Sequence, residues 1–147
     1  LVVGAGTVLD PETARSAILA GAQFIIAPNL SEQVAVVCNR YQIPYAPGCS
    51  SISEAVKGME AGAAFIKAFP ISDFYGPKLV SVFKTPIPVM PILASGGINL
   101  QNLSEYVKNG VDCCGFGGLL TKGSRADIAA NAREIKKIID DTRLSMK

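Results

Sequence analysis

One lysine, Lys67, stands inside an apolar stretch of the chain, AAFIKAFPIS at residues 63–72. Because side chains alternate between the two faces of a strand, Lys67 shares a face with Phe65 and Phe69. Loss of water around an ammonium group lowers the pKa of a lysine, and a neutral amine can attack a carbonyl carbon to form a Schiff base. Lys67 is therefore the first candidate for chemistry. The alternative is a lysine that snorkels out of a strand end or pairs with a buried carboxylate.

Two glycine clusters, ASGGI at residues 94–98 and GFGGLLTKGS at residues 115–124, follow later strands. Paired glycines let backbone N–H groups approach an anion, and a helix N-terminus, expected near Asn99 for the first cluster, favours negative charge. Either cluster alone could be a tight turn. Both together, on consecutive units, favour a phosphate site, which barrels often build from the loops after their last two strands.

The chain has no histidine, so the usual general base and the usual metal ligand are missing. Its four cysteines form no C-x-x-C pair, and we expect all of them to be reduced and buried, as in a cytoplasmic protein. These are Cys38, Cys49, Cys113 and Cys114. We therefore expect no metal and no cofactor, and chemistry from lysine, carboxylates, hydroxyls or backbone.

The composition is that of a globular chain. Its 147 residues are 49% hydrophobic and 18% charged, with a formal net charge of +2. That balance gives no electrostatic case for nucleic acid or for an anionic membrane. No apolar run reaches the roughly 18 residues of a membrane helix, and no signal peptide opens the chain.

Apolar strands are expected at intervals of about twenty residues, with helices between them. Start signals for the helices are Asp10 before Pro11, Ser31, and the S-x-x-E spacing of Ser51 and Glu54. The predicted strands lie near residues 1–4, 24–27, 44–46, 64–69, 89–94 and 111–116. The last helix should place Ile128, Ala132, Ile135 and Ile139 on one face.

Apolar strands that alternate with helices predict a parallel sheet with helices on its outer face. An open doubly wound sheet and a (β/α)8 barrel both fit. An open sheet would commonly carry a dinucleotide loop, but Gly4 and Gly6 lack the third glycine of G-x-G-x-x-G, since position 9 is Leu9. We predict a single TIM barrel domain over residues 1–147, N-terminally incomplete, because about six βα units are visible and the chain starts within an apolar strand.

Five motifs, in this order and spacing, resemble the class I aldolases that cleave 2-keto-3-deoxy-6-phosphogluconate or 4-hydroxy-2-oxoglutarate. The motifs are GAGTVLDPETA, AGAQFIIAPNL, IPYAPGCSSISEA, FIKAFP and SGGI. The resemblance runs from Val3 to about Thr121. It implies a TIM barrel, a small-molecule 2-keto acid substrate, pyruvate and an aldehyde as products, and a homotrimer.

The resemblance also implies roles for individual residues. Lys67 matches the lysine that forms the Schiff base, and Thr7 matches a threonine that holds the pyruvyl carboxylate. Pro28 and Phe69 match residues that wall the pyruvyl pocket. The phosphate is expected at backbone N–H groups, and the residues expected there are Gly96, Gly97, Gly117 and Gly118.

The chain departs from the family's pattern in two ways. The family's acid–base glutamate and a nearby arginine come from a unit upstream of VVGAGTV, so these 147 residues alone are expected to be poor catalysts that do not fold stably. Gly118 also stands where the family often has a serine that contacts phosphate, which removes one donor. Lys122 or Ser124 is the candidate to compensate.

Two other functions fit the same sequence features. One is a phosphate-binding isomerase or epimerase that uses acid–base chemistry without a Schiff base. The other is a non-catalytic or degenerate barrel that binds 2-keto acids.

Overall fold

The computed structural model describes residues 1–146, with the side chains of all of these except residues 71 and 72. Helices and strands alternate for most of the chain. In chain order they are α1 (Pro11–Leu19), β1 (Ile25–Ile26), α2 (Glu32–Tyr41), β2 (Tyr45–Ala46), β3 (Gly48–Cys49), α3 (Ile52–Glu60), β4 (Ile66–Ala68), α4 (Ile71–Tyr75), α5 (Lys78–Lys84), β5 (Ile92–Ser95), α6 (Leu103–Lys108), β6 (Cys113–Gly115), α7 (Gly118–Thr121) and α8 (Arg125–Ser145).

The predicted helix starts are confirmed by the geometry of the caps. The carboxylate of Asp10 accepts a backbone hydrogen bond from the first turn of α1, and Pro11 is the first helical residue. Ser31 caps α2 in the same way. Ser51 and Glu54 form the predicted capping box of α3, each side chain accepting from the other's backbone N–H. These local signals fix where each helix begins along the chain.

All the strand pairs are parallel, and their order in space follows their order in sequence. β1 pairs with β2, and β3, β4, β5 and β6 pair in that order. Pro47, which has no N–H to donate, separates β2 from β3. The segment around β4 bonds to both, because Ala64 N–H donates to the Tyr45 carbonyl at 2.8 Å and Lys67 N–H to the Pro47 carbonyl at 2.9 Å. β2 and β3 are thus one strand with an interruption.

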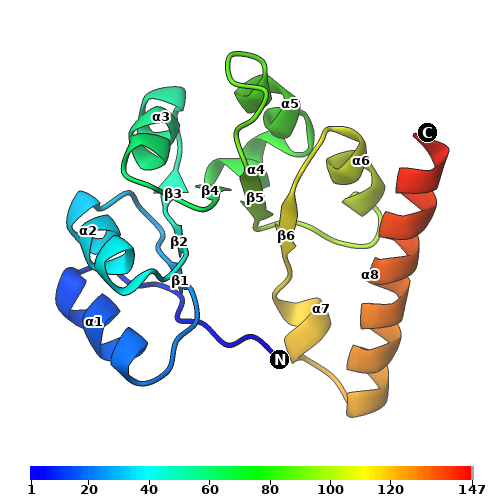
Figure 1. Cartoon of the computed structure of the whole chain (residues 1–147). Helices are drawn as coiled ribbons and strands as arrows, with labels where there is room; N and C mark the ends of the chain where they lie inside the picture. The colour runs from blue at the N-terminus through cyan, green and yellow to red at the C-terminus, as the bar shows by residue number, and fades with distance from the viewer. Residues whose placement is uncertain (147) are drawn as a thin grey trace.

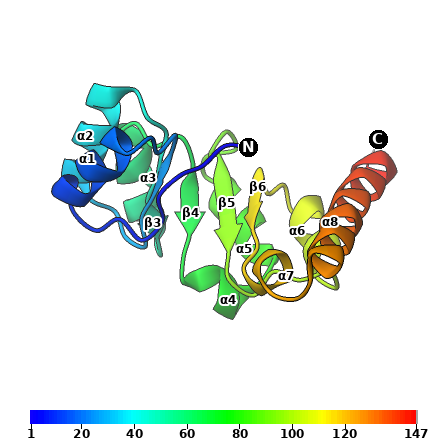
Figure 2. The same cartoon turned by 90° about the horizontal axis from the view of Figure 1, so that it is seen from below.

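The strands form a curved row, and the helices lie along its outer side. Figure 1 shows the helices α1, α2, α3, α5, α6 and α8 in an arc around the strands, with α1 and α8 at its two ends. Viewed from below, α4 and α7 lie on the same side of the row of strands (Figure 2). Because α4 follows β4 and α7 follows β6, this is the side at which the parallel strands end.

The apolar side chains of the strands pack against these outer helices. Ile66 and Ala68 of β4, with Ile92 and Ala94 of β5, belong to one buried cluster with residues of α5 and α6. From the helices this cluster takes Leu79, Val80, Phe83, Leu103, Tyr106 and Val107. A second buried cluster joins α1 and α2 to β1 around Ile25. The core therefore lies between the sheet and the helices, on the outer side of the arc.

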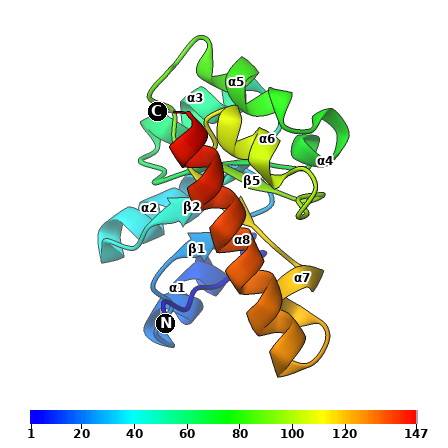
Figure 3. The same ribbon diagram turned by 90° about the vertical axis from the view of Figure 1, so that its right-hand side faces the viewer.

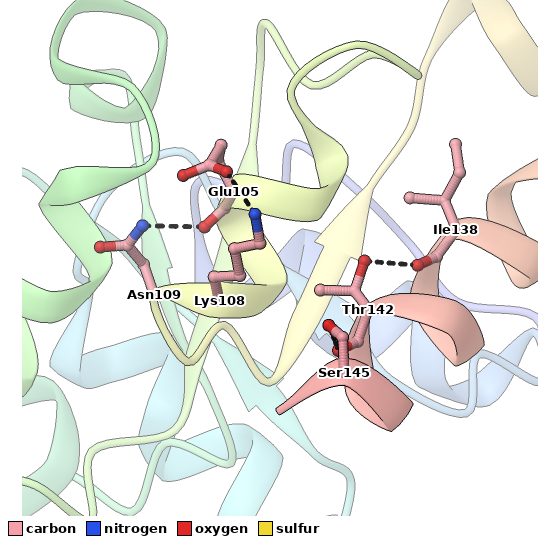
Figure 4. Close-up of polar contacts among 6 residues, drawn as sticks. All are labelled: Glu105, Lys108, Asn109, Ile138, Thr142 and Ser145. Carbon is pink, nitrogen blue, oxygen red and sulfur yellow. Dashed lines mark hydrogen bonds and ion pairs between the residues drawn. The ribbon is translucent and has the colours of Figure 1, made fainter. Parts of the chain in front are cut away.

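Helix α8 closes one end of the arc. It packs against α6 and α7, and Figure 3 shows it lying across this side of the molecule. Its buried Thr142 donates to the Ile138 carbonyl at 2.6 Å, so the hydroxyl is satisfied within the helix. Close by, Lys108 pairs with Glu105 at 2.9 Å near the end of α6 (Figure 4). These polar contacts stay within their own helices, and buried side chains of both helices, among them Leu103 and Ile135, belong to the same cluster.

Some predicted strand and helix limits are wrong. Residues 1–4 are not a strand: Val3 is exposed, and only Ala5 bridges to Ile25. β5 begins at Ile92, later than predicted, because Pro91 lacks an N–H. The helix expected near Asn99 begins at Leu103, because Asn99 and Asn102 form side-chain turns ahead of it.

The sequence patterns also missed three short helices, α4, α5 and α7, which have few turns to display a helical period. On the predicted face of the last helix Ile135 is buried, Ile128 and Ile139 are half-buried and Ala132 is exposed, and Thr142 is buried as well. None of the helices formed by residues 1–146 combines the length and apolar character needed to cross a bilayer. The parallel α/β class is confirmed, and closure into an eight-stranded barrel stays a prediction.

Candidate active site

Strand β4 presents opposite properties on its two faces. Ile66 and Ala68 are buried in the outer cluster, whereas Lys67 between them is half-buried and faces the other way. In the parallel register, Lys67 lies between Gly48 of β3 and Leu93 of β5. Since the helices cover the outer side of the arc, Lys67 faces its open inner side. The predicted alternation of β4 is therefore confirmed.

The amine of Lys67 lies over an aromatic ring. Its Nζ is 4.1 Å from the centre of the Phe69 ring. Burial lowers the pKa of Lys67 below its ordinary value because it removes water from the ammonium group. The ring has the opposite tendency, since its face attracts a cation. Since the pKa is lowered, a greater share of Lys67 is neutral than of a surface lysine at the same pH.

Lys67 has no carboxylate partner within the described residues. The ion pairs there are Lys84–Asp112, Lys108–Glu105 and Lys136–Asp140. The alternative of a buried lysine–carboxylate pair is therefore wrong for this part of the chain. Phe65 is half-buried, and the Phe69 ring supplies the aromatic contact to Nζ.

The backbone of Pro28 lies close to Gly48, which pairs with Lys67 in the parallel register. A Cβ added to Gly48 would lie 2.0 Å from the carbonyl oxygen of Pro28, so only glycine allows this approach. Gly48 is also the register partner of Lys67. Pro28, just beyond β1, and Lys67 of β4 are thus neighbours of the same glycine.

Thr7 has a strained backbone at the end of the first extended segment. Its φ of 58° lies in the left-handed region, which a β-branched residue adopts rarely. The next residue, Val8, donates to the Ile26 carbonyl at 3.2 Å, which places Thr7 beside the end of β1, just ahead of Pro28. Strain of this kind is concentrated at functional sites. The contact of Thr7 with a substrate stays a prediction.

Ser95 is a site residue that the sequence patterns did not single out. It lies two residues beyond Leu93 on β5 and so faces the same inner side as Lys67. A Cβ added to Gly115 on β6 would lie 3.1 Å from its Oγ. A hydroxyl at the carboxyl end of an inner-facing strand, directly before the Gly96–Gly97 pair, was the signal available in the sequence.

The first glycine cluster forms an open loop. Gly96 and Gly97 have φ of 93° and 67°. No protein acceptor within the described residues takes the N–H of either glycine. The Gly97 carbonyl is held by the side-chain amides of Asn99 and Asn102. The predicted helix N-terminus does not follow directly, so these donors act without an adjacent helix.

The second cluster begins helix α7, with Gly117 as its cap residue and Gly118 in its first turn. Ser124 is already committed, because its hydroxyl donates to Asp127 and accepts from the Asp127 N–H. Lys122 packs against Gly118, since a Cβ there would lie 3.6 Å from the Lys122 Cδ. Lys122 and Ser124 both stay predictions as replacements for the missing serine.

Two hollows of the surface lie away from Lys67. One of about 440 Å³ lies between α2 and α3, and one of about 540 Å³ lies between the start of α3 and α5. Lys67 lines neither of them.

The cysteines are free thiols, as expected, but only Cys38 and Cys49 are buried. Burial raises the pKa of Cys38 to about 11 and that of Cys49 to about 12, so both are protonated thiols near neutral pH. The prediction of full burial is wrong for Cys113 and Cys114, which are half-buried on β6, an outer strand of its ladder. Residues 1–146 contain no group of three or more His, Cys, Asp or Glu side chains able to hold a metal ion.

Comparison with known proteins finds one family along nearly the whole chain. The family model described as "KDPG and KHG aldolase" matches residues 1–138. A curated 2-dehydro-3-deoxy-phosphogluconate aldolase of Treponema pallidum is 36% identical over 107 residues, which are 73% of this chain and 51% of the relative. The chain thus spans about half the length of this relative.

Solved structures give the same result. One described as "Native KDPGal structure" is 32% identical, with a TM-score of 0.90, and the match covers 97% of this chain and 70% of that one. A KDPG aldolase of Legionella pneumophila, solved "with pyruvate captured at low pH as a covalent carbinolamine intermediate", is 28% identical with a TM-score of 0.74. That match covers 94% of this chain and 66% of the other. The chain belongs to the KDPG and KHG aldolase family.

Proposed function

We propose that this chain carries the Schiff-base centre of a class I aldolase, a lyase. The substrate would be a 2-keto-3-deoxy sugar acid or 4-hydroxy-2-oxoglutarate, and the products pyruvate and an aldehyde. The observation that carries the proposal is the half-buried Lys67, whose pKa is lowered by burial, on the open inner face near the end of β4. Related aldolases, and a carbinolamine of pyruvate in the Legionella enzyme, support the same reaction class.

The reaction follows from an amine in this position. Neutral Lys67 attacks C2 of the keto acid to give a carbinolamine, which loses water to form an iminium. The C3–C4 bond then breaks, and its electron pair moves into an enamine while the C4 hydroxyl loses its proton and becomes the aldehyde. Protonation at C3 and addition of water release pyruvate and the free amine. The iminium is the electron sink, so this cleavage needs no metal ion.

The neighbours of Lys67 have roles consistent with this sequence of steps. Phe69 and Pro28 would wall the pyruvyl group, and Thr7 and Ser95 would offer hydroxyl groups to its carboxylate. The distal end of the substrate would reach the glycine loops at Gly96–Gly97 and Gly117–Gly118. The proton transfers need an acid–base group, and we assign no residue among 1–146 to that role.

We further propose that the chain forms part of a single (β/α)8 barrel domain and that the protein assembles as a homotrimer in the cytoplasm. The sequential parallel strands with helices outside support the barrel. Exposed apolar side chains on α4 and α5, Phe74, Tyr75 and Val82, offer surface for association. The free cysteines suit a reducing compartment.

Pyruvate release tests the proposed reaction. The protein would be incubated with 4-hydroxy-2-oxoglutarate or 2-keto-3-deoxy-6-phosphogluconate, and pyruvate measured by coupled reduction to lactate. We expect slow release from the native protein, because no acid–base residue is assigned to the proton transfers, and none above background from Lys67→Met. Equal release from both would exclude Lys67 as the nucleophile and favour an acid–base mechanism.

A further inference from the structure

Helix α4 brings a carboxylate against the first glycine loop. A Cβ added to Gly97 would lie 2.4 Å from Oδ1 of Asp73, so this oxygen occupies the space directly beside Gly97. Asp73 is exposed and lies just beyond the end of β4, in the same loop region as the strand that carries Lys67. The two segments are twenty-odd residues apart in sequence, and only the parallel pairing of β4 with β5 brings them together.

The loop that Asp73 touches has donors to offer. The N–H groups of Gly96 and Gly97 donate to no acceptor within the described residues. The asparagine amides hold the Gly97 carbonyl, which fixes the loop and leaves these N–H groups available. Backbone donors in such a loop suit an anion or another acceptor. A group that binds at this loop must also lie next to the carboxylate of Asp73.

Within the residues that the structure describes, no ion pair offsets the charge of Asp73. Burial is the main cause that raises the pKa of Tyr106 on α6, and the charges of Cys114 and Asp73 add to the shift. Lys122 beside Gly118 is a cation on the next loop, so the two glycine loops differ in the charge next to them.

We propose that Asp73 is a specificity-determining residue that selects an unphosphorylated 2-keto-3-deoxy acid with a hydroxyl group at its distal end. A phosphate monoester, which carries close to two negative charges, would meet the Asp73 carboxylate at Gly97. A terminal hydroxyl would instead donate a hydrogen bond to that carboxylate and accept one from the loop N–H groups. The proposal rests on the proposed function, because the substrate's keto end must be held at Lys67.

The experiment compares two keto acids that differ only in phosphorylation. The protein is titrated with 2-keto-3-deoxygluconate or its 6-phosphate, the Lys67 adduct is trapped with borohydride, and peptide mass spectrometry gives the concentration for half-maximal labelling. Asp73→Asn removes the charge and keeps the size. Asp141→Asn on α8 removes the same charge on another part of the chain and is the matched control.

In Asp73→Asn we expect the apparent affinity for the 6-phosphate, relative to the unphosphorylated acid, to rise about tenfold, as removal of one like charge at close range allows. In Asp141→Asn the ratio should stay within about twofold of the native value. An unchanged ratio in Asp73→Asn, with labelling at Lys67 intact and an unaltered circular dichroism spectrum, would overturn the inference and leave the proposed function standing.

A second measurement tests phosphate binding at the loop independently of Schiff-base formation at Lys67. Inorganic phosphate is titrated into the native protein and both variants and followed by ³¹P NMR, which needs no Schiff base. Tighter phosphate binding by Asp73→Asn alone supports the inference. Equal binding by all three proteins overturns it. Failure of pyruvate to label Lys67 would count against the proposed function separately.

Discussion

The two faces of β4 and β5 differ in what they contribute to the molecule. On the outer face Ile66, Ala68, Ile92 and Ala94 are at most 1% exposed and pack under the helices. On the inner face Lys67 and Ser95 are half-buried and polar. Adjacent residues of one strand therefore serve packing and chemistry separately. Substitutions one position apart should accordingly differ in effect: those on the inner face should change pyruvate labelling, and those on the outer face should change the free energy of unfolding.

The largest expected effect is on the inner face. Lys67→Met should abolish covalent labelling by pyruvate and borohydride, because no other amine described here has the same strand position and aromatic contact. Its free energy of unfolding should be equal to or higher than the native value, since a desolvated ammonium is removed. Labelling and urea unfolding, followed by circular dichroism, measure both. Persistent labelling of Lys67→Met would show that the inner face does not hold the reactive group.

The same experiment on the outer face should give the reverse. Ile66→Ala leaves a cavity in the fully buried cluster and should lower the free energy of unfolding by about 3 kcal/mol. Labelling of Lys67 in the folded fraction should persist. Urea unfolding measures the loss, and Ile66→Val, expected to cost about 1 kcal/mol, is the graded control. A loss below 0.5 kcal/mol for Ile66→Ala, on the order of a surface change, would contradict the packing role.

A smaller effect is expected at Thr7, where strain and chemistry coincide. Thr7→Gly relieves the left-handed backbone but adds freedom to the unfolded chain, so we expect a net gain of about 0.5 kcal/mol in unfolding free energy. Pyruvate labelling should weaken because the hydroxyl is lost. Thr7→Ser keeps the hydroxyl and should label as the native protein does. Full labelling by Thr7→Gly would remove Thr7 from the site.

The lowered pKa of Lys67 predicts how stability depends on pH. The ordinary value is 10.5, and the folded value lies below it because of burial. Between the two, the unfolded chain binds more protons than the folded one, so the unfolding free energy rises with pH through that window. The penalty for burying the ammonium is fully present at lower pH. Lys67→Met should therefore gain most over the native protein near neutral pH, and this gain should shrink towards pH 10.5.

The smallest expected effect is that of Phe69→Leu on the pKa of Lys67. Phe69→Leu keeps apolar bulk near Lys67 but removes the ring face, whose attraction for a cation is worth about 0.5–1 kcal/mol. The pKa of Lys67 should then fall further below its ordinary value, because burial would act without the attraction of the ring. The pH dependence of pyruvate labelling measures it. A rise in the pKa would mean that the ring acts mainly by excluding water.

Short sequence signals predicted the features that depend on neighbouring residues, namely helix starts and the faces of a strand. The caps at Asp10, Ser31 and Ser51 fixed three helix starts, and strict alternation placed Lys67 on the face opposite Ile66. The first segment failed as a strand because apolar composition does not by itself provide a ladder partner. Helices α4 and α5 were missed because each is too short to show a period.

The contacts between strands could not be predicted in the same way. The approach of Pro28 to Gly48, and that of Asp73 to Gly97, joins residues twenty or more positions apart and depends on how parallel strands align. The spacing of residues along the sequence does not show how parallel strands align. The inner-facing Ser95 could have been found by the alternation that found Lys67, applied one strand later.

The most direct test of the account is to identify the residue that pyruvate labels. The protein is incubated with pyruvate, reduced with borohydride, digested and mapped by mass spectrometry, with circular dichroism confirming that it is folded. We predict one pyruvyl adduct, on Lys67. A folded protein that is unlabelled, or labelled evenly over its surface lysines, would contradict the Schiff-base function and leave the inner face of β4 as a binding surface without a nucleophile.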